Sequence, residues 1–397
     1  MNKLERAQQA VVEAPELDGW LLYDFRHSNP LFWELLEIDV HSTRRVFLYV
    51  PPSAPGGGQA PALQDTPVLL VHQVDAGHLR RPGLTVVPYQ NGEELLVQLR
   101  SVLGPAKRVA MEYSPMAALP TLSYVDGGTL ELVRSLGIEV VPSAELAQAA
   151  LCRLEPEDLA SHERAASRLG VVVEEAFAFI GREIDRGVDE WTVAEQIRGQ
   201  FVAAGLETDS GPIVAVNGHA GDPHYQPGPS GSTPIRRGDW VLIDLWAKEP
   251  GGTYGDITWT AFAGDSPSEQ QRTVFDLVTG ARDAAVEFLR RETAGGRYPE
   301  GWQVDQAARQ HIERAGQGAH FTHRLGHSLG AMVHGHGANL DGYETHDTRR
   351  LVPGLAFTIE PGVYLPDFGV RSEINLYMEE GGPRITSDVQ REIVLIK

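Results

Sequence analysis

Two pairs of acidic residues stand at matched spacing in the second half of the chain. Asp244 in VLIDLWA interrupts an apolar, strand-like segment, and Asp256 follows it beyond the turn-forming residues 249–252. Glu360 and Glu373 likewise flank a turn-forming segment, 366–369. An ionised carboxylate in an apolar strand is costly unless it is paired or bound to a cation. Each pair therefore predicts a hairpin with one carboxylate on each arm.

Two such hairpins packed together would gather four carboxylates. Their mutual repulsion would raise their pKa values or require cations, and two divalent metal ions can share bridging carboxylates. His327, one of five histidines between residues 320 and 336, supplies an imidazole. This donor set suits two Mn(II) ions and also accepts Co(II), Fe(II) or Zn(II). For any single acid, the alternative is a strand-end residue paired with an arginine or a backbone cap.

Two other hydrolase arrangements fit the sequence less well. The segment 326–330 matches G-x-S-x-G and would make Ser328 a nucleophile, but residues 320–325 before it are polar, whereas such an elbow follows an apolar strand. His323 and His327 have the spacing of a zincin helix, yet an arginine stands where the catalytic glutamate belongs and two glycines weaken the helix.

The elements that must position these residues form two successive units of long helix, short helix and strands. This order predicts an internally duplicated α+β domain over residues 155–397. The expected helices are 156–187, 190–204, 268–292 and 304–314, and the expected strands are 213–216, 240–247, 256–262, 356–359 and 371–378.

Residues 1–154 alternate strand and helix patterns, which predicts a separate α/β domain. Residues 51–64, rich in Pro, Gly and Ala, predict a mobile surface loop. The expected strands are 20–25, 46–50, 68–72, 84–89, 109–113 and 138–141, and the expected helices are 93–103 and 129–136.

The composition of the chain limits the classes of binding partner and the cell compartment that can be expected. With 34 basic and 54 acidic residues the net charge is −20, which argues against nucleic acid or an anionic membrane as a partner. Cys152 is the single cysteine, so no intramolecular disulfide can form and a reducing compartment is expected. Residues 1–19 carry charges where a signal peptide needs an apolar stretch, and no run approaches the ~18 apolar residues of a membrane span. We therefore expect a cytoplasmic enzyme.

The motifs of the second half resemble the pita-bread metallopeptidase family, which includes methionine aminopeptidase, Xaa-Pro aminopeptidase and prolidase (Xaa-Pro dipeptidase). The matching segments are VLIDLWA, YGDITWT, GHSLG, FTIEPGVY and VRSE. The resemblance implies that Asp244 holds one metal ion, that His327 and Glu360 hold the other, and that Asp256 and Glu373 bridge the two.

The resemblance also implies accessory residues. His224 in PHYQP, His323 and His334 resemble the substrate-side histidines of the proline-specific branch, and Arg371 matches an arginine of the active-site surroundings. The implied catalytic residues are His224, His323, His334 and Glu360, with Glu360 as proton shuttle. The implied substrate contacts are Arg371, His334 and His224.

Residues 1–154 resemble the creatinase/prolidase N-terminal domain, which implies dimerisation and closure of the substrate site. The expected activity is hydrolysis of Xaa-Pro dipeptides; the alternatives are an Xaa-Pro aminopeptidase acting on longer peptides and a non-catalytic binding scaffold. A dipeptidase must also bind the free carboxylate of its substrate, for which Arg371, Arg44, Arg45, Arg349 and Arg350 are candidates.

The chain departs from the family pattern at two places. GHSLG replaces the usual GHGIG, and the glutamate of the HE-x-P pattern is missing after His334. Because the five implied ligands are unchanged, these departures concern the shape of the substrate pocket.

Overall fold

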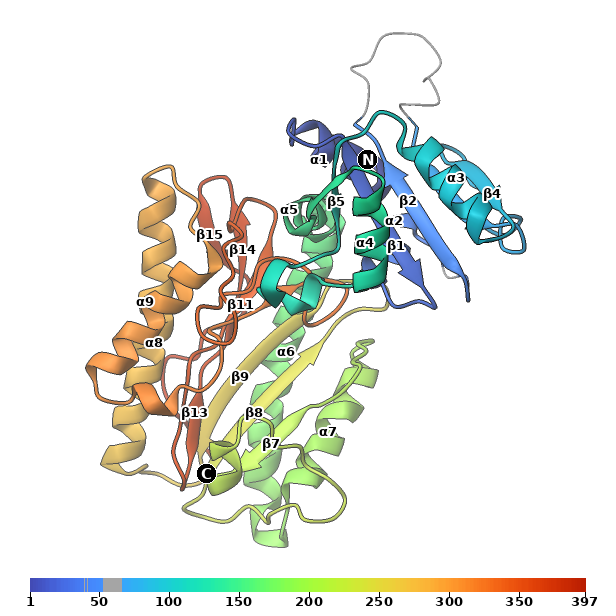
Figure 1. The fold of residues 1–397 in the computed structure, drawn as a ribbon. Coiled ribbons are helices and arrows are strands. Elements are labelled where there is room, and N and C mark those ends of the chain that lie inside the picture. Colours follow the sequence, from blue (N-terminus) through green and yellow to red (C-terminus); the bar gives the residue numbers. More distant parts are fainter. Residues whose placement is uncertain (39, 41, 53–65) are drawn as a thin grey trace. The chain divides into compact units, whose positions relative to one another are not determined.

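A computed structural model describes residues 1–38, 40, 42–52 and 66–397 of the chain. The chain divides into two compact units, Met1–Cys152 and Arg153–Lys397 (Figure 1). The predicted loop at 51–64 lies outside the described residues from position 53 onward. Among the described residues, no helix is long and apolar enough to span a membrane.

The first unit is built on a six-stranded sheet with strand order β4-β3-β2-β1-β5-β6. Its central strand β1 pairs antiparallel with β2 and parallel with β5, so the predicted α/β character is confirmed. Three helices of this unit, α1, α2 and α5, were not predicted. One of them, α2, is apolar almost throughout and carries no 3.6-residue period that a sequence pattern could reveal. The elements are α1 (Lys3–Val12), β1 (Gly19–Phe25), α2 (Pro30–Leu36), β2 (Arg45–Val50), β3 (Val68–His72), β4 (Thr85–Tyr89), α3 (Gly92–Leu103), β5 (Arg108–Met111), α4 (Gly127–Ser135), β6 (Glu139–Pro142) and α5 (Ala144–Ala147).

The second unit contains the predicted duplication of a helix pair followed by a sheet. In the first half, α6 and α7 pack on the sheet β16-β9-β8-β7; in the second half, α8 packs beside the sheet β10-β11-β14-β15 and against α9 (Figure 1). The first-half elements are α6 (Pro156–Glu183), α7 (Glu190–Ala203), β7 (Ile213–Val216), β8 (Trp240–Ala247) and β9 (Gly255–Phe262). The second-half elements are α8 (Glu269–Ala294), α9 (Gly301–Arg314), β10 (Ser328–Leu329), β11 (Ala356–Ile359), β12 (Gly362–Tyr364), β13 (Gly369–Arg371), β14 (Ile374–Glu379), β15 (Gly382–Ile385) and β16 (Val394–Leu395).

Local sequence sets the ends of the long helices. Pro156 begins α6, where a missing N–H costs little. The Ser268 hydroxyl accepts the Gln271 N–H at the start of α8, and the Gln271 side chain accepts the Ser268 N–H in return. The apolar face of α6 then packs on β8 and β9, which places the core of this half directly beneath the acidic hairpin.

The expected strand 371–378 is in fact two strands, β13 and β14. The pairs Ile359–Ile374 and Gly362–Arg371 share one antiparallel register, so the hairpin is continuous on both sides of the break. At the break the ladder is interrupted, because the Glu360 N–H donates to the Leu325 carbonyl and the Glu373 N–H donates to the Thr258 carbonyl. The interruption therefore falls at the two glutamates predicted to bind metal.

Two side-chain amides from the second half, that of Asn375 on β14 and that of Gln390 in the segment before β16, bind backbone groups of β9. Asn375 on β14 accepts the Asp256 N–H at 3.0 Å and donates to the Asp256 carbonyl. Gln390 does the same for Thr260, with distances of 2.9 and 2.6 Å. Each amide satisfies one N–H and one C=O of β9. These bonds fix the register between the halves and so bring the two acidic hairpins together.

Candidate active site

The first two carboxylates share one face of the β8–β9 hairpin. Asp244 lies opposite Thr258, and Asp256 stands two residues before Thr258 on the same strand. Side chains two residues apart on a strand point to the same face, so Asp244 and Asp256 form a diagonal pair. Both are buried, with exposed fractions of 7 and 5%.

The other two carboxylates flank the break in the second hairpin. The Thr258 hydroxyl donates to Glu373 Oε2 at 2.8 Å, so the first hairpin holds an acid of the second. The Thr358 hydroxyl donates to Glu360 Oε1 at 3.2 Å. The two acids therefore face the same space as Asp244 and Asp256, as the matched spacing predicted.

His327 presents one ring nitrogen to the acids. Its Nδ1–H donates to the Ser328 carbonyl at 3.2 Å, which leaves Nε2 as the unprotonated nitrogen of the neutral ring. Nε2 lies 3.4 Å from Glu360 Oε1 and 3.6 Å from Asp256 Oδ2. Burial lowers the pKa of His327, which favours this neutral ring. A backbone carbonyl that fixes the second nitrogen is the usual arrangement of a metal-binding histidine.

The chemistry of this donor set fits divalent cations. Asp256, His327 and Glu373 each offer a ligand atom within 4.8 Å of the others. Within the described residues, one oxygen each of Asp244, Asp256 and Glu373 is buried without a hydrogen-bond partner. A buried carboxylate oxygen without a partner is costly, and a metal ion would satisfy it.

The electrostatics lead to the same conclusion. Burial, and then the neighbouring carboxylates of Asp244 and Glu360, raise the pKa of Asp256 well above its usual range. Burial, and then Asp256 and Glu360, do the same to the pKa of Glu373. Burial also raises the pKa of Glu360, although His327 and Arg371 oppose it. The repulsion expected from the sequence is therefore present, and cations would relieve it.

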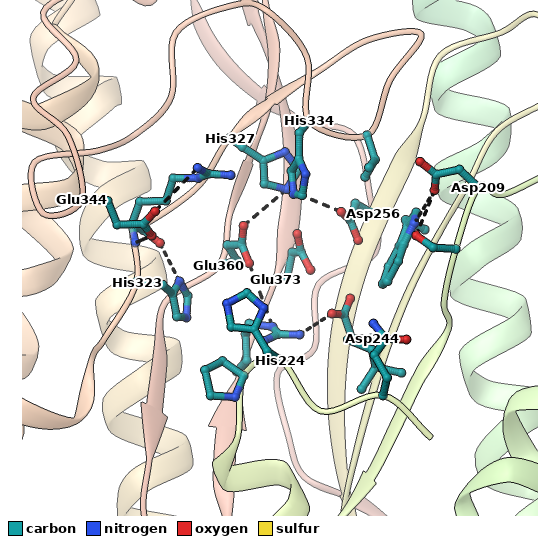
Figure 2. A pocket seen from close by; sticks show the side chains of 18 residues that line it. Asp209, His224, Asp244, Asp256, His323, His327, His334, Glu344, Glu360 and Glu373 are labelled. Carbon is teal, nitrogen blue, oxygen red and sulfur yellow. Dashed lines mark hydrogen bonds and ion pairs between the residues drawn. The ribbon is translucent and has the colours of Figure 1, made fainter. Parts of the chain in front are cut away.

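All nine predicted site residues line one cavity of about 450 Å³ (Figure 2). The four carboxylates lie at its centre, with His327 and His334 on one side and His224 on the other (Figure 2). The nine residues are His224, Asp244, Asp256, His323, His327, His334, Glu360, Arg371 and Glu373. Residues separated by up to 149 positions in the sequence thus meet at one place.

Arg371 is fully engaged within the protein. Its three guanidinium nitrogens contact the Thr258 hydroxyl at 3.0 Å, the Tyr364 hydroxyl at 3.1 Å and Asp244 Oδ2. Its side chain is 6% exposed. Arg371 therefore links the two hairpins through partners that are themselves buried.

His323 is fixed through both ring nitrogens. Nδ1–H donates to the Arg324 carbonyl at 2.7 Å, so Nε2 accepts the Tyr364 hydroxyl at 2.7 Å. Burial, and then the charge of Arg371, lower the pKa of His323 to about 3. Burial raises the pKa of Tyr364 to about 12. His323 is therefore a neutral acceptor that orients Tyr364.

The two remaining histidines keep ring atoms open to the cavity. His334 meets His327 edge-on, with ring centroids 4.4 Å apart. His224 lies on an exposed loop, and its backbone N–H donates to Asp222 Oδ1 at 3.0 Å. Both imidazoles are thus placed where a substrate can reach them.

Sequence reasoning missed several residues of this site. Thr258 and Tyr364 lie inside the recognised segments YGDITWT and FTIEPGVY, so a signal for them was present. Arg324, Glu344 and Asp209 also line the cavity. Glu344 and Asp209 come from loops without a recognisable motif, and only the fold brings them to the site.

Of the other arginine candidates, Arg349 and Arg350 belong to the second unit and do not line this cavity. Arg349 is buried in an ion pair with Asp347 and donates to the carbonyls of His336 and Gly337. Arg44 and Arg45 belong to the first unit. Ser328 is buried on the two-residue strand β10, and residues 321–330, all of which are described, contain no helix. This excludes the strand-to-helix elbow and the zincin helix.

The sequence profile of metallopeptidase family M24 matches residues 161–389, which contain every predicted metal ligand. The chain belongs to metallopeptidase family M24. The predicted resemblance to the pita-bread metallopeptidases is thereby confirmed, and the chain is a metallopeptidase of a family that uses divalent metal ions.

Named relatives of this M24 protein include dipeptidases. It is 29% identical over 320 residues to the probable dipeptidase PepE of Mycobacterium tuberculosis, covering 79% of this chain and 77% of the relative. It is 32% identical over 218 residues to the Xaa-Pro dipeptidase of Pyrococcus furiosus, covering 53% of this chain and 57% of the relative. The crystal structure of dipeptidase PepE from Mycobacterium ulcerans matches with a TM-score of 0.72 at 24% identity, covering 99% of this chain and 97% of that one. The likeness in structure confirms the predicted fold of both units.

Proposed function

We propose that this M24 protein hydrolyses the Xaa-Pro bond of dipeptides with two divalent metal ions, preferentially Mn(II). The observation that carries the proposal is the convergence of four carboxylates and the Nε2 of His327 in one cavity. Asp244, Asp256 and Glu373 are buried, and one oxygen of each has no hydrogen-bond partner among the described residues. The relatives named dipeptidase and Xaa-Pro dipeptidase support the choice of substrate.

The residues divide between the two ions as the family resemblance implies. Asp244 would hold one, His327 and Glu360 the other, and Asp256 and Glu373 would bridge both. When bound, the ions would supply Lewis acidity toward the scissile carbonyl and lower the pKa of a water molecule. The oxygen-rich donor set favours Mn(II) and accepts Co(II), Fe(II) or Zn(II).

Glu360 is the residue that we assign to proton transfer. Burial raises its pKa, so it exchanges a proton more readily near neutral pH than an exposed carboxyl does. Its Oε1 accepts the Thr358 hydroxyl at 3.2 Å and lies 3.4 Å from His327 Nε2, which fixes its orientation toward the centre of the cavity. A fixed, largely enclosed carboxyl is suited to receive a proton from the attacking water and pass it to the leaving proline nitrogen.

The neighbouring residues orient the substrate. His323 and Arg371 hold the Tyr364 hydroxyl from two sides, so this hydroxyl has a fixed position beside the reacting centre. His224 and His334 would contact the peptide directly, because both line the cavity and no side-chain hydrogen bond occupies their rings among the described residues. A tertiary Xaa-Pro amide has no N–H, so ring shape and these contacts must select the substrate.

The proposal is tested with metal-stripped protein reconstituted with Mn(II), using Ala-Pro as substrate. We expect hydrolysis that depends on added metal and is lost in His327→Ala, together with metal binding. His346→Ala is the matched control, since His346 is exposed and does not line the cavity. Metal-replete His327→Ala with the turnover of the unaltered protein would contradict the proposal. Parallel reconstitution with Co(II), Zn(II) and Fe(II) ranks the metals.

Ala-Pro-Ala, followed beside Ala-Pro, decides between the two exopeptidase activities. A dipeptidase cleaves Ala-Pro and leaves the tripeptide largely intact. Equal or faster cleavage of the tripeptide would establish an Xaa-Pro aminopeptidase instead.

We also propose that the protein is a cytoplasmic homodimer whose first unit contributes to dimerisation. The single cysteine and the resemblance of residues 1–154 to the creatinase/prolidase N-terminal domain support this. Sedimentation equilibrium of the full chain tests the assembly, and fractionation of the source cells tests the compartment.

A further inference from the structure

We infer that Arg324 binds the free carboxylate of the substrate's terminal proline and that Glu344 positions its guanidinium. The inference rests on the proposed function and names the group that restricts the site to dipeptides. Arg324 lies outside the recognised motifs, so the sequence did not indicate this role. The role is inferred from the position of Arg324 in the wall of the cavity.

Two permanent positive charges line the cavity among the residues that the structure describes, Arg324 and Arg371. Arg371 is unavailable, because its three nitrogens contact Thr258, Tyr364 and Asp244 and its side chain is 6% exposed. A substrate carboxylate would have to displace buried partners, which would then lack a hydrogen bond.

Arg324 is placed differently. Its side chain is 22% exposed, and NH1 lies 3.9 Å from Glu344 Oε2, too far for a hydrogen bond. Within the described part of the chain, this ion pair is the one polar contact that the Arg324 guanidinium makes. A guanidinium carries five N–H donors in a planar fork that matches a carboxylate, so Arg324 can bind a second carboxylate beside Glu344.

Glu344 is fixed before any substrate arrives. Its Oε1 accepts the Arg324 backbone N–H at 2.9 Å. Asp341 Oδ1 accepts the N–H groups of Tyr343 and Glu344, each at 2.9 Å, which closes the loop that carries Glu344. Arg309 on α9 stacks over the Tyr343 ring at 4.3 Å and anchors the loop. The carboxylate beside the Arg324 guanidinium is therefore a fixed part of the site.

The two ends of the cavity match the two ends of a dipeptide. Glu344, beside Arg324, and Asp209 lie on opposite sides of the four carboxylates (Figure 2). Asp209 accepts the indole N–H of Trp246 at 3.1 Å and is exposed. A dipeptide with its ammonium group toward Asp209 and its carboxylate toward Arg324 would place its single peptide bond between them, over the acids. A third residue would carry the carboxylate past Arg324.

The test compares Ala-Pro with its C-terminal amide, Ala-Pro-NH₂, which lacks only the negative charge. In Arg324→Met we expect KM for Ala-Pro to rise about 10- to 100-fold, the loss of one charged hydrogen-bonded pair, while KM for the amide changes less than about twofold. Arg324→Lys should recover part of the affinity for Ala-Pro. Glu344→Gln should raise KM for Ala-Pro about two- to fivefold, because the guanidinium loses the ion pair that positions it, and an unchanged KM would show that Glu344 does not position Arg324.

Arg290→Met is the matched control, because Arg290 is an exposed arginine of α8 that does not line the cavity. It should leave both KM values unchanged. An equal rise in KM for acid and amide in Arg324→Met, or no rise for the acid, would overturn the inference while leaving the proposed hydrolysis intact.

Calorimetric titration of the metal-loaded protein with L-proline and L-prolinamide separates this inference from the proposed function. The unaltered protein should prefer proline, and Arg324→Met should lose that preference. If the unaltered protein hydrolyses no Xaa-Pro peptide yet shows this pattern, the proposed hydrolysis fails and the carboxylate site stands. If it shows no preference for proline, the carboxylate site is refuted.

Discussion

Thr258 is the side chain whose removal tests the site most directly without touching a predicted metal ligand. Its hydroxyl donates to Glu373 Oε2 at 2.8 Å and accepts the Arg371 Nε–H at 3.0 Å, and the residue is fully buried. Thr258→Val keeps the shape and the β-branch, which suits the strand. The substitution therefore removes two hydrogen bonds to charged groups and almost no volume.

The magnitude follows from these contacts. Hydrogen bonds to charged groups contribute about 1.5–3 kcal/mol each, so two of them set an expected loss of about 3–6 kcal/mol. A domain of 150–250 residues shifts its thermal midpoint by about 2–4 °C per kcal/mol, so Thr258→Val should lower the midpoint by at least about 6 °C. Thr258→Ser keeps the hydroxyl and loses only a methyl group, at a cost of roughly 1 kcal/mol.

Tryptophan fluorescence during thermal unfolding of the metal-free protein is a suitable assay. Five of the seven tryptophans belong to Arg153–Lys397, so the signal follows the second unit. Titration with Mn(II) should in addition show weaker binding to Thr258→Val, because Glu373 loses the bond that orients it. Unfolding of Thr258→Val within about 2 °C of the unaltered protein, or equal destabilisation of Thr258→Ser, would show that the Thr258 hydroxyl does not hold the two hairpins together.

Three further outcomes are expected. Asp256→Asn should abolish metal-dependent hydrolysis and lower bound metal, measured by elemental analysis, with little loss of fold; a metal-loaded, fully active variant would contradict this. The pKa values of Asp256 and Glu373 are higher in the folded than in the unfolded protein. Below about pH 4 both carboxyls are protonated in the folded and in the unfolded chain, so they do not reduce the free energy of unfolding. As the pH rises toward the folded pKa values, they reduce the free energy of unfolding of the metal-free protein increasingly. The thermal stabilisation by Mn(II) should therefore grow as the pH rises above about 4, and a stabilisation that does not change with pH would contradict this expectation. Glu190 accepts the Tyr225 hydroxyl and the Thr233 N–H at 2.5 and 2.7 Å, so Glu190→Gln should destabilise the loop of His224 by about 1–3 kcal/mol and lower kcat/KM for Ala-Pro; unchanged kinetics would separate this loop from the substrate.

The element pattern of the chain was largely readable from sequence. The long helices α6 and α8 carry strong 3.6-residue apolar periods and defined N-terminal caps, and both were predicted. The apolar helix α2 and the division of 371–378 into β13 and β14 were not. The formation of α2 and the break between β13 and β14 both depend on the residues that pack against these segments in the folded chain. Those residues are distant in the sequence, so the local pattern does not reveal them.

The same division holds for the site. The types and spacing of the four acids predicted that two hairpins would each present two carboxylates. A charge inside an apolar strand is costly unless it is paired or bound to a cation, so these positions pointed to a metal site. The four acids are Asp244, Asp256, Glu360 and Glu373. Thr258 and Tyr364 lie within the recognisable segments YGDITWT and FTIEPGVY, but these segments do not reveal the roles of the two residues.

Only the tertiary structure decided what surrounds these acids. The amide of Asn375 on β14 binds the backbone of Asp256 on β9, so the distance between the two acid pairs depends on a residue 119 positions from Asp256. The fold also decided that Arg371 is engaged while Arg324 faces the cavity beside Glu344. Local sequence sets the side chain and its strand or turn, whereas the availability of a charge depends on every group packed around it, and those groups come together only when the chain has folded.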